Sequence, residues 1–252
     1  MKKLTVFCAA ACLAASAAAQ NHPDLHEVLD RQKGRNLIEI PKGTYTLDVR
    51  SNGPYKFHNL TDVHINGNGS TVICNNQEQA FSFYNCVRVE LRDLTIDYDP
   101  LCFTQGEITA VAEDGSWFDV RIDEGYPVTG LAANRVQFYD PQTRLLKRNS
   151  ITTYTSNYSA LKQLGHNLFR AVKNGTWSAG EQVGDLVVMD VKTDKPNASV
   201  HTVMLNKCYN TKLENVTVYG SNTFSFFEKE GYANEYRNCV VDRGPMPQGI
   251  RP

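Results

Sequence analysis

LTDVHIN at residues 60–66 and LRDLTID at residues 91–97 follow one pattern: apolar, any, Asp, apolar, any, aliphatic, polar. LENVTV at residues 213–218 repeats it with Asn for Asp, and YRNCVVD at residues 236–242 repeats it once more. The alternation of aliphatic and polar residues is the period of a strand with one buried face. The Asp or Asn favours a turn or bulge, because a small polar side chain bonds the neighbouring backbone. The repeats predict stacked coils that bury their apolar faces against each other.

The spacing of the repeats separates a second unit from the coils. Val63 to Leu94 is 31 residues and Val216 to Cys239 is 23, whereas Leu94 to Val216 is 122. About one hundred residues between the last two are therefore an insertion, an estimate that rests on the repeat period. Short strand-like runs fill this segment, at residues 107–111, 117–122, 135–139, 168–172 and 185–191. They predict a small antiparallel barrel or sandwich at residues 100–202.

The segment before the first repeat predicts a cap. Leu25, Val28 and Leu29 have helical spacing behind Pro23, and two short strand-like runs follow at residues 37–47 around a Pro-x-Gly turn. A helix laid over these strands closes the open edge of a stack of coils. Residues 20–99 are thus interpreted as the cap and first coils, and residues 203–252 as continuing coils that stop early.

The N-terminus predicts export. Lys2 and Lys3 precede an apolar run at residues 4–15 that is too short to cross a bilayer, and Ala17 and Ala19 provide small side chains for cleavage. Residues 1–19 are therefore predicted to be a signal peptide, with a periplasmic or extracellular mature protein. Lipidation of Cys12 is an alternative, which the missing leucine-containing box disfavours.

Composition excludes several classes of function. Without the two leader lysines the chain has 27 acidic and 24 basic residues, a net charge of −3, so no basic field for nucleic acid is present. Nothing after the leader resembles a membrane span. Five cysteines remain, and an odd number argues against a disulfide scaffold. Cys86 and Cys208 each precede the last aliphatic of a repeat by ten residues, so we expect them on adjacent coils, either bonded or as stacked thiols.

Several segments resemble known carbohydrate-active proteins. IEIPKGTYTL at residues 38–47 looks like the first coil of pectate-lyase-type β-helix proteins. Three further segments, at residues 91–111, 118–128 and 135–148, resemble the β-helix with inserted β-barrel of glycoside hydrolase family 110, the exo-acting α-1,3-galactosidases: LRDLTIDYDPLCFTQGEITAV, FDVRIDEGYPV and RVQFYDPQTRLLKR.

This resemblance implies an all-β fold, a right-handed parallel β-helix with an inserted antiparallel β-barrel-like subdomain. It also implies metal-independent, inverting hydrolysis with no cofactor, by acidic residues on later coils. No family carboxylate matches a numbered position here. The chain ends at Pro252, where such proteins continue, so we expect an N-terminal portion that is inactive alone.

The residues themselves offer weak candidates for a glycan site. Asp97 and Asp99 could act as a catalytic pair, although Asp99-Pro100 is also a turn signal. Glu228 and Glu230 are predicted to share a face beside aromatic residues that suit a sugar platform, or else to form a solvated corner of an apolar coil face. Beyond these, Asp242 is a catalytic candidate and Arg243 a substrate-binding candidate, with a structural ion pair as their alternative. His22 and His26 lack a third ligand, so no metal site is predicted.

The sequence thus favours an exported glycoside hydrolase of α-galactosidase type acting on a polysaccharide or glycan, of undetermined oligomeric state. A non-catalytic glycan-binding or structural β-helix is the main alternative. A polysaccharide lyase is another, but no cluster provides the cation site and basic residue it needs. The stacking itself is testable: Ile65, Ile96, Val218 and Val241 are predicted to point inward in one row.

Overall fold

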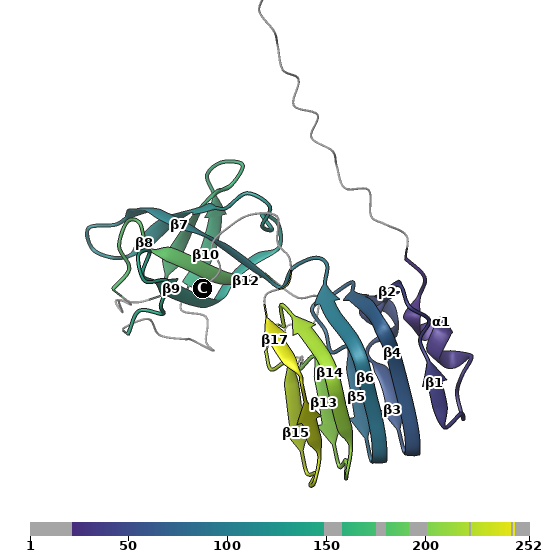
Figure 1. The fold of residues 1–252 in the computed structure, drawn as a ribbon. Coiled ribbons are helices and arrows are strands. Elements are labelled where there is room, and N and C mark those ends of the chain that lie inside the picture. The colour runs from purple at the N-terminus through teal and green to yellow at the C-terminus, as the bar shows by residue number, and fades with distance from the viewer. Residues whose placement is uncertain are drawn as a thin grey trace, which may run out of the picture.

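The computed structural model describes residues 22–148, 158–174, 180–191, 201–221, 223–242 and 244. The predicted signal peptide, Cys12 and Arg243 lie outside these residues. The chain forms a parallel β-helix and a separate antiparallel sheet (Figure 1). No helix in the described ranges is long and apolar enough to cross a membrane.

Three faces make up the β-helix. The first face is a parallel sheet in the order β15-β13-β5-β3. Its strands are β3 (Tyr55–His58), β5 (Phe81–Tyr84), β13 (Val203–Asn206) and β15 (Phe226–Lys229). The long strands β4 (Thr61–Cys74), β6 (Val87–Tyr98) and β14 (Lys212–Tyr219) form the second face with their first halves and the third face with their second halves. The second face adds β1 (Leu37–Glu39) and β16 (Glu235–Arg237), and the third adds β2 (Thr44–Leu47) and β17 (Val240–Asp242).

Residues with positive φ mark the corners between faces. The corner between the first and second faces has two in each coil: Asn59 and Asp62, Asn85 and Arg88, Lys207 and Asn210, Glu230 and Ala233. The corner between the second and third faces has Asp93, Asn215 and Asn238, at φ between 51° and 55°. Asn215 donates from Nδ2 to Asp93 Oδ1 at 2.7 Å and accepts from Asn238 Nδ2 at 3.3 Å. The predicted turn role of the repeat Asp and Asn is therefore confirmed, because Asn and Asp tolerate this backbone conformation best among residues with a side chain.

The predicted inward row is correct in part. Val218 lies opposite both Ile96 and Val241, as expected, but Ile65 lies opposite Leu91 on the second face, whereas Ile96 lies on the third. Asp62 and Asp93 are not equivalent: Asp62 lies at the first corner, between the first and second faces, and Asp93 lies at the second corner, between the second and third faces. Val63 therefore pairs with Val89, 26 residues away, and not with Leu94. Both corners place a positive-φ residue between inward apolar ones, which makes their sequences look alike. Val241 is 63% exposed, because no described strand covers β17 from outside.

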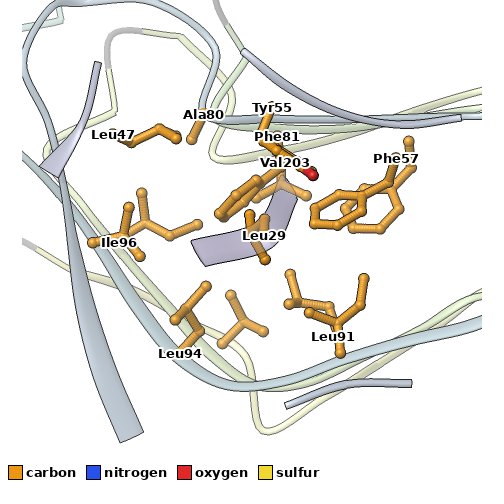
Figure 2. Close-up of a cluster of buried hydrophobic side chains, with 14 of the residues drawn as sticks. Leu29, Leu47, Tyr55, Phe57, Ala80, Phe81, Leu91, Leu94, Ile96 and Val203 are labelled. Carbon is orange, nitrogen blue, oxygen red and sulfur yellow. The ribbon is translucent and has the colours of Figure 1, made fainter. Parts of the chain in front are cut away.

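Apolar side chains fill the coil interior (Figure 2). Phe57 and Phe83, on neighbouring strands of the first face, stack with ring centroids 4.8 Å apart. The predicted cap helix is confirmed as α1 (Leu25–Asp30). Asp24 caps its N-terminus, because the Asp24 carboxylate accepts a hydrogen bond from the His26 amide. Leu25 and Leu29 are buried in the same core, so α1 closes the first end of the stack. A short helix, α2 (Val49–Asn52), connects β2 to β3.

The inserted segment forms a six-stranded antiparallel sheet in the order β10-β11-β8-β7-β12-β9. Its strands are β7 (Phe103–Val111), β8 (Trp117–Ile122), β9 (Leu131–Tyr139), β10 (Tyr158–Gln163), β11 (Leu168–Lys173) and β12 (Leu186–Val191). Phe118 and Phe138 meet edge to face in its own core, 5.5 Å apart. Backbone pairing among the described residues links the strands in order from β10 to β9. The separate antiparallel unit is therefore confirmed, and its barrel-like or sandwich form stays a prediction.

Among the described residues, two hydrogen bonds tie the segment that leads into the inserted sheet to the β-helix. The Gln77 side chain donates to the Leu101 carbonyl at 3.4 Å, and the Cys102 thiol donates to the Gly220 carbonyl. The sheet also holds its own ends together, because Asp190 on β12 pairs with Phe103 on β7. The chain therefore leaves the β-helix after β6 and returns to it before β13 at neighbouring points.

Candidate functional site

Two of the predicted carboxylates lie on one outward row of the third face. Ile96 and Tyr98 are buried, so Asp97 between them points outward. Val218 lies opposite Ile96, which places the next residue, Tyr219, beside Asp97, and Tyr219 lies opposite Asp242. We call Asp97, Tyr219 and Asp242 the acidic row. Residues 145 positions apart in the sequence are thereby brought onto successive coils.

The geometry of the acidic row follows from the strand spacing. Neighbouring parallel strands lie about 4.8 Å apart, so the α-carbons of Asp97 and Asp242 are separated by about 10 Å. Asp97 is half-buried, and its carboxylate accepts from the Tyr98 amide at 2.8 Å. Asp242 is exposed. Strands β14 and β17 end on the side of the β-helix that faces the inserted sheet (Figure 1).

A ladder of threonines borders the acidic row. Thr44, Thr71, Thr95 and Thr217 pair in succession across β2, β4, β6 and β14, and all are half-buried at outward positions. Their hydroxyls add donors and acceptors beside the carboxylates. At the end of the row, Gly244 has φ +63°, and a Cβ built there would lie 2.8 Å from Tyr219 Cγ. A side chain at that position would displace the tyrosine ring.

Asp99 does not belong to this row. Strand β6 ends at Tyr98, and Asp99 follows it as an exposed residue before a cis peptide bond to Pro100. Its amide donates to the Cys74 carbonyl at 3.0 Å, as expected of a turn that leaves the strand. The turn interpretation of Asp99 therefore fits the structure better than a catalytic pair with Asp97.

Glu228 and Glu230 do not share a face, contrary to the prediction. Strand β15 ends at Lys229, and Glu230 lies at the first corner with φ 56°. Glu228 instead lies opposite Leu205, in the inward row that contains Phe83 and Phe57. Alternation along a strand would put both acids on one side, but the corner residue turns Glu230 away.

The Glu228 carboxylate lines a hollow at the last described coil. It accepts from Asn234 Nδ2 at 2.8 Å and from the Tyr236 hydroxyl at 3.3 Å. Phe226, Tyr236, Cys239 and Val241 also line this hollow. Burial, together with the nearby Glu228 charge, raises the pKa of Tyr236 above its ordinary value. Glu228 is thus hydrogen-bonded by a neutral phenol and an amide, with no second carboxylate beside it among the described residues. This arrangement fits a structural role at the end of the coil interior better than a pair of catalytic acids.

Cys86 and Cys208 occupy equivalent positions on adjacent coils, as predicted. The amide that follows Cys208 donates to the Cys86 carbonyl at 2.9 Å, and both side chains are buried as free thiols. The Cys208 thiol lies within hydrogen-bonding reach of Cys86 and lowers the pKa of that thiol, whereas the pKa of Cys208 is raised by the same contact. The stacked-thiol interpretation therefore describes this pair. Within the described ranges, no group of three or more His, Cys, Asp or Glu side chains is placed to hold a metal ion.

Sequence reasoning missed Tyr219 and the threonine ladder. The signal was available: Asp97, Tyr219 and Asp242 each follow the last aliphatic residue of a repeat match. Thr95 and Thr217, in the second and third repeat matches, likewise lie one position before that aliphatic. Reading the polar positions of the repeat as columns, and not only the apolar ones, would have predicted both rows.

Comparison with known proteins adds no family to this description. No protein-family model and no curated protein sequence matches the chain. The fold and the side chains gathered on its faces are therefore the basis on which a function can be argued. They define a parallel β-helix with a separate antiparallel sheet and a row of carboxylates on the third face.

Proposed function

We propose that this chain is an exported, carbohydrate-active β-helix protein, a glycoside hydrolase of α-galactosidase type in which Asp97 and Asp242 are the two working carboxylates. The observation that carries the proposal is the acidic row, which sets two carboxylates on either side of an aromatic ring on one outward surface. The segments that resemble family 110, and the leader at residues 1–19, support the substrate class and the export.

The spacing of the two carboxylates suits an inverting reaction. Inverting enzymes hold their carboxyl groups about 6.5–9.5 Å apart to leave room for water. Side chains on α-carbons about 10 Å apart reach this separation with small changes of rotamer. One carboxyl group donates its proton to the leaving glycosidic oxygen as that bond breaks. The other takes a proton from water, whose oxygen forms the new bond to the anomeric carbon.

Tyr219 gives this arrangement a surface on which a sugar can rest. Tyr219 stands between the two acids in the register, and the carbon-bound hydrogens of a pyranose pack well against an aromatic face. The threonine hydroxyls along the neighbouring row offer hydrogen bonds to sugar hydroxyls. A terminal galactose stacked on Tyr219 would have its glycosidic oxygen and its anomeric carbon within reach of opposite acids.

Hydrolysis of α-1,3-galactosyl oligosaccharides tests the proposal. The sequence alone predicted an inactive portion, but the acidic row supplies both carboxylates from within this chain. We therefore expect galactose release, with the inverted anomer appearing first by NMR. Asp97→Asn and Asp242→Asn should each reduce the rate about 10²- to 10⁴-fold, the usual contribution of one acid or base. Asp99→Asn is the matched control and should leave the rate unchanged. Absence of turnover, or turnover that survives both substitutions in the acidic row, would contradict the catalytic assignment.

A non-catalytic glycan-binding role is the second candidate. Phe224 is 56% exposed beside the first face, and exposed aromatic surface commonly marks a binding site. Glycan binding without turnover, unaffected by either substitution in the acidic row, would favour this role. Mass spectrometry of the mature protein tests the export step separately, because cleavage after Ala19 gives a chain that begins at Gln20.

A further inference from the structure

The outer surface of the first face is basic, although the whole chain carries a slight negative charge. Lys56 and His58 are exposed on β3, and Lys229 is exposed on β15. None of the outward positions on the four described strands of this sheet is acidic. Glu228 on β15 points inward and therefore does not neutralise these cations.

The outward side chains form rows that cross all the strands of this face. His58, Tyr84, Asn206 and Lys229 are successive partners in the register of β3, β5, β13 and β15. At about 4.8 Å per strand this row spans about 14 Å. The strand spacing is close to the repeat of sugar residues along an extended chain, so a glycan laid across the strands presents one residue to each.

Aromatic rings provide stacking surfaces on the same side. Tyr84 is exposed, and its ring lies 5.6 Å from that of His58. Phe227, the outward neighbour of Lys229, stacks on His201 at 4.1 Å with 23° between the planes, and Phe224 continues the stack at 5.8 Å. Rings held by each other in this way keep a fixed orientation, which a sugar platform requires.

The corner beside this face adds a third lysine, Lys207, and a carboxylate, Glu230, that lies near two of the three lysines. Lys207 Nζ lies 5.8 Å from the centre of the Tyr84 ring and 3.8 Å from Glu230 Oε2. Glu230 also approaches Lys229 Nζ at 3.4 Å. Glu230 is thus the carboxylate shared by Lys207 and Lys229, while Lys56 lies on β3 at the other edge of the sheet. Cations therefore outnumber carboxylates on this surface.

The second face has no such excess. Glu90 lies between His64, at 2.8 Å, and Lys212, at 3.4 Å. Lys212 in turn pairs with Glu214, which Arg237 also approaches at 3.8 Å. Acidic and basic side chains alternate there and pair with each other, which indicates a structural role for the charges of the second face. The first face instead presents cations beside exposed aromatic rings.

We propose that the outer surface of the first face binds an acidic glycan, a sugar chain that carries uronic-acid carboxylates. The chain lies across β3, β5, β13 and β15, its carboxylates pair with Lys56, Lys207 and Lys229, and its ring faces stack on Tyr84 and Phe227. This surface is distinct from the acidic row and binds its ligand whether or not that row is catalytic.

Titration calorimetry with an oligogalacturonide, and with a neutral galactan as the comparison, tests the proposal. We expect measurable affinity for the uronate chain that falls as NaCl is added, because screening weakens exposed ion pairs. Lys56→Gln and Lys229→Gln should each weaken binding about three- to tenfold, the loss expected for one exposed charge-assisted hydrogen bond. Glu230→Gln should strengthen binding about threefold, because it frees two lysines.

Tyr84→Ala separates a built site from a diffuse charge effect. It leaves the charge unchanged and should weaken binding about fivefold through lost stacking. Lys162→Gln, on an exposed position of β10 in the inserted sheet, is the matched charge control and should have no effect. Thermal melting of each variant checks that it remains folded.

Three outcomes would overturn the proposal: equal affinity for the neutral galactan, tighter binding of single-stranded DNA than of the uronate, or a loss with Lys162→Gln as large as with Lys56→Gln. Binding that survives Asp97→Asn and Asp242→Asn separates this surface from the acidic row. Failure of hydrolysis and failure of uronate binding are therefore distinguishable.

Discussion

Asn215 offers a sharp test of what fixes the corners of the β-helix. It has φ 54°, donates to Asp93 at 2.7 Å and accepts from Asn238 at 3.3 Å. Asn215→Ala removes both bonds, worth together about 1 kcal/mol at an exposed site. It also places a Cβ without hydrogen-bonding capacity in the left-handed region, at a further cost of about 1–2 kcal/mol. The expected loss in the free energy of unfolding is about 2–3 kcal/mol.

Asn215→Gly loses the same two bonds but adopts positive φ freely. Glycine makes the unfolded chain more flexible, which costs about 0.4–1 kcal/mol relative to alanine. The left-handed penalty outweighs this term, so the glycine variant should be more stable than the alanine variant by about 0.5–1 kcal/mol. Urea unfolding followed by far-UV circular dichroism measures both. Trp117 fluorescence is less suitable, because this residue lies on β8 of the inserted sheet.

Lys56 provides the matched control, because it lies at an ordinary outward position of a strand. There the order should reverse, with Lys56→Gly less stable than Lys56→Ala by about 0.5–1 kcal/mol. If glycine is no better than alanine at Asn215, or the two sites show the same order, the left-handed corner is not what selects Asn and the reasoning fails.

Three further predictions concern packing and charge. Phe83→Ala should lower the free energy of unfolding by about 3–5 kcal/mol because it empties a fully buried site, whereas Phe224→Ala, at an exposed ring, should cost less than about 1 kcal/mol; chemical denaturation compares them. Gly67→Ala should cost about 1–3 kcal/mol, because its Cβ would lie 2.4 Å from a carbonyl oxygen of the next coil, and an unchanged denaturation midpoint would disprove this contact. The Asn75 side chain donates to Asp48 and holds the pKa of the Asp48 carboxyl below its ordinary value. The ionised carboxylate therefore adds stability at any pH above the ordinary pKa, and this stability is lost as the pH falls through the lowered pKa of the folded protein. The stability difference between the wild type and Asp48→Asn should therefore shrink below about pH 4, and a difference that is constant with pH would refute the assignment.

Local pattern was enough to predict the strands of the repeats, the turn role of their Asp and Asn residues and the insertion, because each has a signal within a few residues. Val216 to Cys239 is a true coil length for this reason. The four short strands of the first face carry no such repeat and were not predicted. Register is different: it depends on which strand lies alongside, and two corners of the same coil carry the same apolar-Asp-apolar signal. Asp62 and Asp93 were therefore equated although they occupy different corners.

The candidate site shows the same division. Asp97 and Asp242 were each identified as acids at strand ends, but their proximity follows from coil stacking across an insertion, which no local pattern contains. Glu228 was expected to share a face with Glu230, because strand alternation puts residues two apart on one side. Its position opposite Leu205 becomes visible only when β15 is registered on β13.

The junction between β6 and β14 has a consequence for how the chain reaches its native state. These strands pair although their partners, such as Leu94 and Val216, are 122 residues apart, whereas Val63 and Val89 are 26 apart. Closing the longer loop costs about 1.4 kcal/mol more if the intervening chain is unstructured. The inserted sheet removes this cost when it folds first, because pairing of Asp190 with Phe103 brings its two ends together. During synthesis the first coils precede the insertion, and the coils after it dock at a lower entropic cost once the sheet has closed. We therefore expect a variant that destabilises the core of the inserted sheet alone to slow the growth of the β-helix beyond β6.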